Sequence, residues 1–369
     1  MGNSQSQSGG YLNYCDYLAD ILCCVACGIQ ITGCTRKDIL NEREDWKRSA
    51  RWRGHLFTTA AELEHMYFKK NPKLWSYYYR AILVDSEGDQ LSGICPKIYH
   101  SKKHVNRVPT DPQRARIFGP VRKGSRNVDF RMARIVYDTE PDIPKERIGY
   151  PIHAHCWLLL DRVIGHEIVK KHLREFGRAA DAYWWRNLGN WGTGLWHHED
   201  EMLCYGTKSQ TGWHKPVIYH VTGSPLRIPG IQKLITQATR ECADVHLRGH
   251  SAIVDLPLDI AILIVDLIYG SRPRSMERLI DTRNLLEAFQ WKLPETYWKT
   301  RCNYWLVFEM DDLIREKRAV NWSRFCLGLE ELLLERGWYC NSGLRTRQRA
   351  LTSLGGIKEH FLRMIEKQN

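Results

Sequence analysis

The sequence predicts an α+β fold, with an N-terminal mixed α/β domain that holds a small sheet, then an all-α region and C-terminal helices. Segments rich in aromatic and β-branched residues, which favour strands, lie in the first half. Apolar residues at helical spacing dominate the second half. Of the 369 residues, 43% are hydrophobic and 26% are charged, a balance typical of a globular protein with room for more than one domain.

Changes in composition along the chain predict four regions. We expect a Cys-rich N-terminal segment at 1–34 and an aromatic-rich α+β domain at 35–240. A helical region at 250–305 and C-terminal helices at 306–369 follow. Prolines at 216, 225 and 229 precede the expected boundary near 240.

Local patterns predict the elements of the α+β domain. The charged run 36–70 is expected to be helical. Residues 75–84 are aromatic and β-branched, and with the turn SEGD and residues 90–94 they predict a hairpin. Residues 130–138 alternate apolar and basic residues and predict another strand. Residues 152–176 are expected to be helical, with a break at Gly165.

The excess positive charge is concentrated in one stretch. The net charge is +12, and residues 97–134 hold eleven Lys or Arg against two Asp. Prolines and glycines in this stretch predict a long basic loop. An anionic membrane surface could dock there, although a solvated insertion without a partner is commoner. Nucleic acid is not favoured as a partner, because only three aromatic residues accompany the charges.

The cysteines and the first residues bear on localisation. Twelve cysteines without a secretory signal indicate a reducing intracellular setting, cytoplasmic or nuclear. The apolar window 17–34 contains Asp20 and is too short to span a bilayer. Gly2 after Met1, with Ser6 four residues on, matches the N-myristoylation pattern and would attach the chain to a membrane. One such lipid chain binds a membrane only marginally, so acylation of Cys15, Cys23 or Cys24, or attraction by the basic loop, would have to assist.

The same N-terminal cysteines have a competing use. Cys24 and Cys27, with Gly28 directly after, have the spacing of a zinc knuckle, which supplies half of a tetrahedral site. The other half is expected from His153 and Cys156, whose i, i+3 spacing can point both side chains one way. Together they predict a structural zinc site of three cysteines and one histidine. His155 and Cys34 are alternative ligands, and a buried thiol with a hydrogen-bonded histidine is the competing structural interpretation.

Residues 253–268 predict an unusually apolar helix that begins near Pro257. One stripe at helical spacing consists of Ile260, Leu263, Ile264, Leu267 and Ile268. The opposite side is apolar as well, through Leu258, Ile262 and Val265. A helix that is apolar on two sides needs two surfaces to cover it. Periodicity alone favours burial within one domain, whereas a second protein is the alternative.

Four segments in this order resemble a group of filamentous-fungal F-box-like (F-box domain-containing) proteins. They are the C-x-x-C-G at 24–28, WSYYYRAILVDSEGDQLSGI at 75–94, GYPIHAHCWLLL at 149–160, and DLPLDIAILIVDLI with LPETYWKTR at 255–301. The resemblance covers roughly residues 24–305 and makes 250–305 an F-box-like region.

The resemblance implies docking onto the adaptor subunit of an SCF-type ubiquitin ligase. Leu256 and Pro257 match the Leu-Pro start of an F-box, and the apolar helix after it is matched by Leu258, Ile260, Leu263, Ile264 and Leu267. A ligase subunit would supply the second surface that this helix requires. The following segment, 271–289, departs from the leucine-rich second helix of a standard F-box, and no substrate-reading repeats follow.

The sequence is compatible with three functions. The favoured one is a non-enzymatic adaptor that recruits an unknown target protein to the ligase. The alternative is an acylated membrane-peripheral scaffold whose F-box-like helices are only structural. An enzyme is least favoured, because the chain has no phosphate-binding Gly-rich loop, Gly-x-Ser-x-Gly turn or metalloprotease helix. A catalytic site would require convergence of His153, His155, His197 and His198 with nearby acids.

Overall fold

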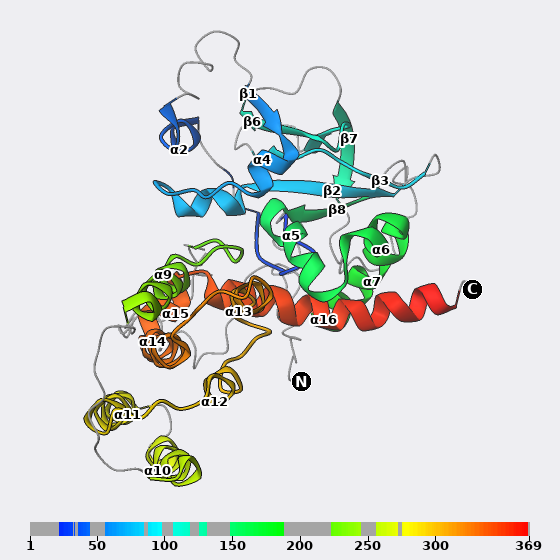
Figure 1. The fold of residues 1–369 in the computed structure, drawn as a ribbon. Coiled ribbons are helices and arrows are strands. Elements are labelled where there is room, and N and C mark those ends of the chain that lie inside the picture. Colours follow the sequence, from blue (N-terminus) through cyan, green and yellow to red (C-terminus); the bar gives the residue numbers. More distant parts are fainter. Residues whose placement is uncertain are drawn as a thin grey trace, which may run out of the picture. The chain divides into compact units, whose positions relative to one another are not determined.

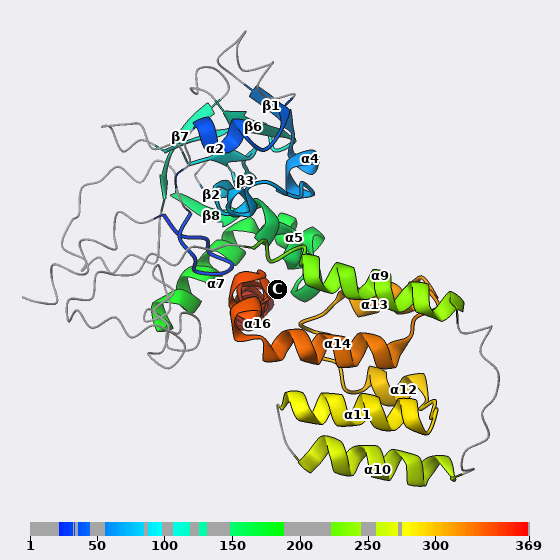
Figure 2. The same cartoon turned by 90° about the vertical axis from the view of Figure 1, so that its left-hand side faces the viewer.

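The chain folds as two compact units, which Figures 1 and 2 show in two views. The computed structural model describes residues 22–31, 33, 36–44, 56–84, 88–97, 106–118, 125–130, 148–187, 223–244, 256–271 and 275–367. Described residues up to 226 and from 346 onward form unit 1, and those from 227 to 345 form unit 2. Strands lie in unit 1 and unit 2 is helical, which confirms the α+β class.

Unit 1 contains a mixed sheet and a separate strand pair. Its strands are β1 (Leu56–Thr59), β2 (Tyr78–Val84), β3 (Gln90–Leu91), β4 (Cys95–Pro96), β5 (Asn106–Pro109), β6 (Arg114–Phe118), β7 (Ser125–Phe130) and β8 (Ile148–His153). The larger sheet has the order β3-β2-β8-β7-β5, with β4 also paired to β2, and β1 pairs with β6. All pairs are antiparallel except β7 with β8.

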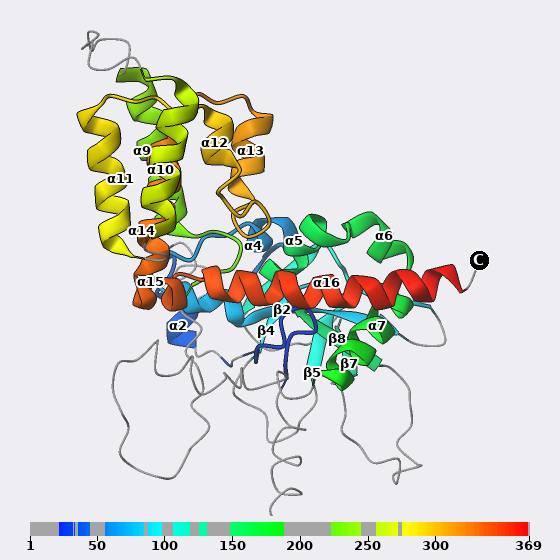
Figure 3. The ribbon, with the colours of Figure 1, turned by 90° about the horizontal axis from the view of Figure 1, so that it is seen from below.

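Helices cover one face of the larger sheet (Figures 1 and 3). The helices of unit 1 are α2 (Arg36–Leu40), α4 (Ala60–Glu64), the 3₁₀ turn η1 (Pro72–Ser76), α5 (Ala154–Val163), α6 (His166–Lys171), α7 (Leu173–Arg186) and, from residue 346, α16 (Leu344–Glu366). Phe176 of α7 meets Phe361 of α16 edge to face, with ring centroids 5.7 Å apart. Both rings are fully buried, so this contact anchors α16 in the core of unit 1.

The central strand β2 explains why the sheet is buried. Its first six residues are buried, so both faces of the strand are covered, and its one charged residue, Arg80, is buried as well. β8 pairs with β2 along six positions, from Tyr79 opposite His153 to Val84 opposite Ile148. This register places the end of β8 beside the start of β2, where the candidate metal ligands lie.

Several sequence expectations for unit 1 are confirmed and others are wrong. The hairpin is confirmed by β2 and β3, and the helix break by Gly165, which has φ +106°. The helical expectation for 36–70 is wrong at Leu56–Thr59, because these four residues form β1 and pair with β6. The region 97–134 is not one loop, because it holds β5, β6 and β7. Buried apolar residues, Val108 of β5 and Ile117 of β6, stand among the basic ones that suggested a loop. The strand expected at 130–138 lies outside the described residues after Phe130.

Unit 2 is built from helices that surround one apolar core (Figure 2). They are α9 (Pro229–Asp244), α10 (Leu258–Ser271), α11 (Met276–Ala288), α12 (Glu295–Lys299), α13 (Glu309–Arg315), α14 (Trp322–Leu334) and α15 (Arg336–Asn341). Close helix packing requires small residues: a Cβ on Gly328 of α14 would lie 2.7 Å from Leu234 of α9. Because α9, α13 and α14 share this core, the helical unit extends beyond the expected 250–305 on both sides.

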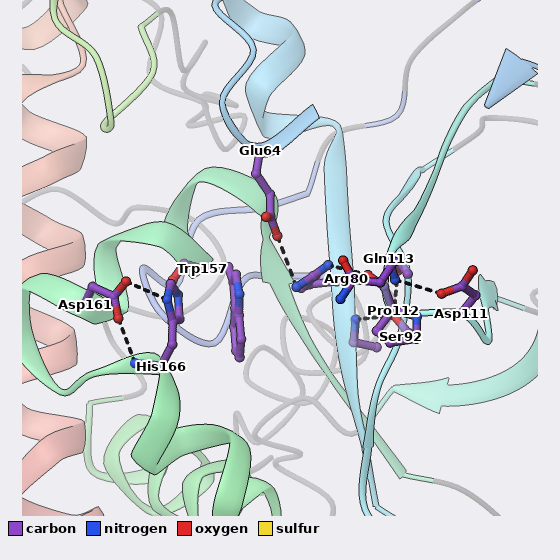
Figure 4. A network of polar contacts seen from close by, with 11 residues as sticks. Glu64, Arg80, Ser92, Asp111, Pro112, Gln113, Trp157, Asp161 and His166 are labelled. Carbon is purple, nitrogen blue, oxygen red and sulfur yellow. Dashed lines mark hydrogen bonds and ion pairs between the residues drawn. The ribbon is translucent and has the colours of Figure 1, made fainter. Parts of the chain in front are cut away.

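A buried ion pair ties β2 to α4 in unit 1 (Figure 4). Arg80 Nη1 lies 3.1 Å from Glu64 Oε1, and Arg80 Nη2 donates to the Pro112 carbonyl at 2.9 Å. The guanidinium also lies 5.4 Å from the ring centroid of Trp157, which stacks on His166. Burial raises the pKa of the Glu64 carboxyl, and the nearby Arg80 charge opposes that rise.

Glu64→Gln is expected to lower the free energy of unfolding by about 3 kcal/mol, because it leaves the Arg80 charge buried without its counter-ion. Urea unfolding followed by tryptophan fluorescence measures the change. Glu167→Gln is the matched control: it removes a carboxylate from the exposed pair with Lys170 and should cost under about 1 kcal/mol. Equal losses in the two variants would contradict a special role for the buried pair.

Candidate functional site

The C-x-x-C segment forms a tight turn. The Gly28 amide donates to the Cys24 carbonyl at 2.7 Å, and an isolated bridge between Cys23 and Gln30 closes the segment. Gly28 has φ +65°, a conformation that residues with a side chain rarely adopt. A Cβ at Gly28 would also lie 2.5 Å from the ring of Trp184 on α7. Glycine is therefore required here both by the backbone and by the close contact.

The second half of the site lies where β8 passes into α5. His153 is the last residue of β8 and the N-cap of α5, and Cys156 lies in the first turn of that helix. The expected i, i+3 relation between these two residues thus spans a strand end and a helix start. The side chains of His153 and Cys156 both lie next to the N-terminal turn, at the end of β8.

The structure brings together the four residues that the sequence predicted. One potential ligand atom from each of Cys24, Cys27, His153 and Cys156 lies within 4.8 Å of the others, and all four residues are buried. His153 Nδ1 is 3.5 Å from Cys27 Sγ and 3.9 Å from Cys156 Sγ. Tetrahedral zinc, with bonds of about 2.0–2.3 Å, separates nitrogen and sulfur ligands by roughly 3.6 Å. The cluster can therefore hold a metal ion.

The thiols of the cluster are electrostatically unequal. Burial alone would raise the pKa of the Cys24 thiol, but hydrogen bonds with Cys156 and Cys27 outweigh it, and the pKa lies well below its ordinary value. Burial raises the pKa of the Cys27 and Cys156 thiols well above that value. The His153 amide donates to Cys24 Sγ at 3.3 Å, which further supports negative charge on that sulfur.

Hydrogen bonds between its backbone and several other elements hold the N-terminal turn in place. The Val25 amide donates to the Pro151 carbonyl at 2.8 Å, and Trp184 Nε1 donates to the Val25 carbonyl at 2.7 Å. Arg349 Nε of α16 donates to the Cys27 carbonyl at 2.7 Å. Sequence reasoning missed these supporting residues, because nothing in local spacing links α7 and α16 to the cysteine turn.

The sequence also predicted alternative zinc ligands, acylation sites and catalytic histidines. His155 faces away from the cluster: its Nδ1 lies 2.7 Å from Ser224 Oγ, and burial lowers its pKa to about 3, so it stays neutral. Gly2, Cys15 and Cys34 lie outside the described residues. Cys23 and Cys24 are fully buried, whereas a lipid anchor requires an accessible sulfur. His197 and His198, the other half of the enzymatic hypothesis, also lie outside the described residues.

The second predicted site is α10 with the two residues before it. Val265 is fully buried and Ala261 nearly so, and they face the rest of unit 2. The other side is open: Leu263 is 57% exposed and Leu267 73%. The predicted residues that are exposed are Leu256, Pro257, Leu258, Ile260, Leu263 and Leu267, whereas Ile264 is half-buried.

Polar contacts fix α10 on its neighbours. The Tyr297 hydroxyl of the α12 helix donates to Asp266 Oδ1 at 2.7 Å, and Arg301 forms an ion pair with the same carboxylate. Two exposed residues of α11, Met276 and Ile280, add to the apolar surface of unit 2. Sequence reasoning missed this pair, although its i, i+4 spacing on a helix could have indicated a shared face.

Comparisons with known proteins add no relative. No family model matches the chain, and neither curated proteins nor solved structures contain a match. Among the described helices, none has the length and apolar character that a bilayer crossing requires. The functional argument therefore rests on the two sites themselves.

Gly28→Ala is expected to destabilise unit 1 by about 3 kcal/mol, because a Cβ adds backbone strain and collides with Trp184. Gly88→Ala is the matched control, since Gly88 shares a positive φ of +129° but has no atom within 4 Å of an added Cβ. Chemical denaturation measures both. If the two variants lose equal stability, the packing of Trp184 on Gly28 does not contribute.

Proposed function

We propose that Cys24, Cys27, His153 and Cys156 hold a structural zinc ion. The donor set supports zinc, because thiolate and imidazole ligands suit this ion, whereas magnesium and calcium take oxygen ligands. Four protein ligands from buried residues leave no position for a substrate, as in structural rather than catalytic sites. The ion would join the N-terminal turn to the junction of β8 and α5.

The energetic role of such an ion follows from the chain separation of its ligands. Cys27 and His153 are 126 residues apart, and closing a loop of that length costs roughly 4 kcal/mol. Zinc bound by peptides with similar ligands contributes about 10–16 kcal/mol. The free energy of zinc binding would therefore exceed the free-energy cost of loop closure. The ion would stabilise the attachment of residues 22–31 to the rest of unit 1.

Purified protein is expected to contain one zinc ion per chain by inductively coupled plasma mass spectrometry. Cys27→Ser should weaken zinc binding at least tenfold, because a hydroxyl is a poor replacement for a thiolate ligand. Cys23→Ser is the control, since Cys23 is buried beside Cys24 but is not part of the cluster. Retention of one tightly bound zinc by Cys27→Ser, or its absence from the folded wild type, would contradict the proposal.

We further propose that the chain is a non-enzymatic adaptor whose α10 face docks onto the adaptor subunit of an SCF-type ubiquitin ligase. The single observation that carries this proposal is the exposed apolar face that begins at Leu256 and Pro257 and continues through Leu263 and Leu267. Apolar surface of this kind on a charged protein is characteristic of interaction sites. Unit 1 would then bind the target protein, whose identity is open.

The size of the face is compatible with a specific contact. Full burial of one leucine or isoleucine side chain contributes about 1.5–3 kcal/mol. The exposed aliphatic residues of the docking face are Ile260, Leu263 and Leu267, at helical spacing on one side of α10, together with Leu256 and Leu258 at the start of the helix. Partial burial of these five could offset the loss of translational and rotational freedom and still give the roughly 8 kcal/mol of a micromolar complex.

Leu263→Asp combined with Leu267→Asp is expected to weaken binding to the purified ligase adaptor subunit at least ~100-fold, because two anchors are lost and two charges are introduced. Isothermal titration calorimetry measures the affinity. The control is Ile314→Asp with Leu333→Asp, which alters similarly apolar exposed residues on α13 and α14.

The same binding measurement, together with a vesicle assay, separates the adaptor proposal from the scaffold alternative. If the wild type fails to bind the ligase subunit, the adaptor proposal is wrong. Flotation of N-myristoylated protein with phosphatidylserine vesicles, insensitive to the two α10 substitutions, would then favour a membrane-peripheral scaffold.

A further inference from the structure

Two cysteines of unit 2, far in sequence from the candidate metal centre, face each other. Cys302 lies just after α12 and Cys326 lies on α14, and both are free thiols. Their sulfur atoms are 2.7 Å apart, although 24 residues separate them in the chain. A disulfide bond is about 2.0 Å long, so the sulfurs need to approach by less than about 1 Å.

We propose that Cys302 and Cys326 are a redox modification site that forms an intramolecular disulfide by exchange with a low-molecular-weight disulfide such as oxidised glutathione. This proposal depends neither on zinc binding nor on the adaptor function. It assigns a chemical role to two thiols of unit 2, of which Cys326 belongs to the apolar core and Cys302 packs against it.

The two thiols differ in solvent exposure, and this difference sets the order in which they react. Cys302 is half-buried and reaches solvent, whereas Cys326 is buried. Its hydrogen bond with Cys302 and its burial raise the pKa of the Cys326 thiol, so Cys326 keeps its proton in the reduced protein. Cys302 is therefore the thiol that meets the oxidant, and Cys326 resolves the product.

The exchange balances in two displacements. The Cys302 thiolate, its proton released to solvent, attacks one sulfur of oxidised glutathione and displaces glutathione thiolate. Cys326 then transfers its proton to the released glutathione thiolate. The resulting Cys326 thiolate attacks the Cys302 sulfur of the mixed disulfide and displaces the second glutathione, which takes up a proton from solvent. The net result oxidises two protein thiols to one disulfide and reduces one oxidised glutathione to two glutathione molecules.

The disulfide would join two elements that already touch. In the reduced form the Cys326 thiol donates to the Trp298 carbonyl of α12 at 3.3 Å. Trp298 is a buried core residue, so the end of α12 is already held against α14. A covalent bond would close a loop of about 25 residues and restrict the unfolded chain, which raises stability.

Peptide mapping of the full-length protein tests the proposal. The protein is incubated in defined ratios of oxidised to reduced glutathione, blocked with N-ethylmaleimide and digested with trypsin. Cys302 lies in the expected peptide 302–315 and Cys326 in 325–336, each with one cysteine and with cleavage sites between them. We expect these peptides to be linked by a disulfide that dithiothreitol reverses, and the melting temperature of the oxidised protein to rise by roughly 5 °C or more.

Two variants separate the specific bond from general oxidation. Cys302→Ser should remove both the linked peptides and the rise in melting temperature. Cys95→Ser, which alters a buried thiol of unit 1, should retain both. Stable glutathione on peptide 302–315 of the wild type without a link to 325–336 would overturn the proposal, and this result requires no variant to fold.

Discussion

The convergence of Cys24, Cys27, His153 and Cys156 is the constraint on which the organisation of unit 1 depends. Residues 22–31 contain only a turn and an isolated bridge, and so they have little secondary structure to stabilise them. Their buried sulfurs, together with hydrogen bonds to Pro151, Trp184 and Arg349, attach this segment to the sheet and helices. Elements from the beginning, middle and end of the chain therefore meet around one small cluster.

The candidate metal ligands could be predicted from the sequence because each half of the site carries its own local signal. A C-x-x-C followed by glycine and an H-x-x-C are each short, and the chemistry of zinc requires two such halves. The supporting residues carried no such signal, since Trp184 and Arg349 act through long-range hydrogen bonds. The loop predicted at 97–134 was wrong, because the many basic residues there outweighed the few apolar residues of strands whose stability comes from pairing with other strands.

The apolar helix shows a different limit of sequence analysis. Periodicity identified α10 and its two apolar sides, but only packing decides which side faces the core. The smallest apolar residue of the helix, Ala261, and the β-branched Val265 turn inward, whereas the larger leucines at 263 and 267 point outward. Small inward residues allow close approach to α11, and the outward leucines retain the greater area for a partner.

The described cysteines occupy three kinds of environment, and burial alone does not distinguish them. Cys23 and Cys95 are as buried as the cluster thiols, yet neither belongs to a group of metal-ligand atoms among the described residues. Cys302 and Cys326 have one sulfur neighbour each, which suits a disulfide but is insufficient for a tetrahedral ion. Among the described cysteines, only the N-terminal group adds a third sulfur and an imidazole nitrogen at separations compatible with a metal ion. The number and spacing of donor atoms, rather than depth in the protein, therefore distinguish a thiol outside any cluster, a pair of neighbouring thiols and a group that could hold a metal ion.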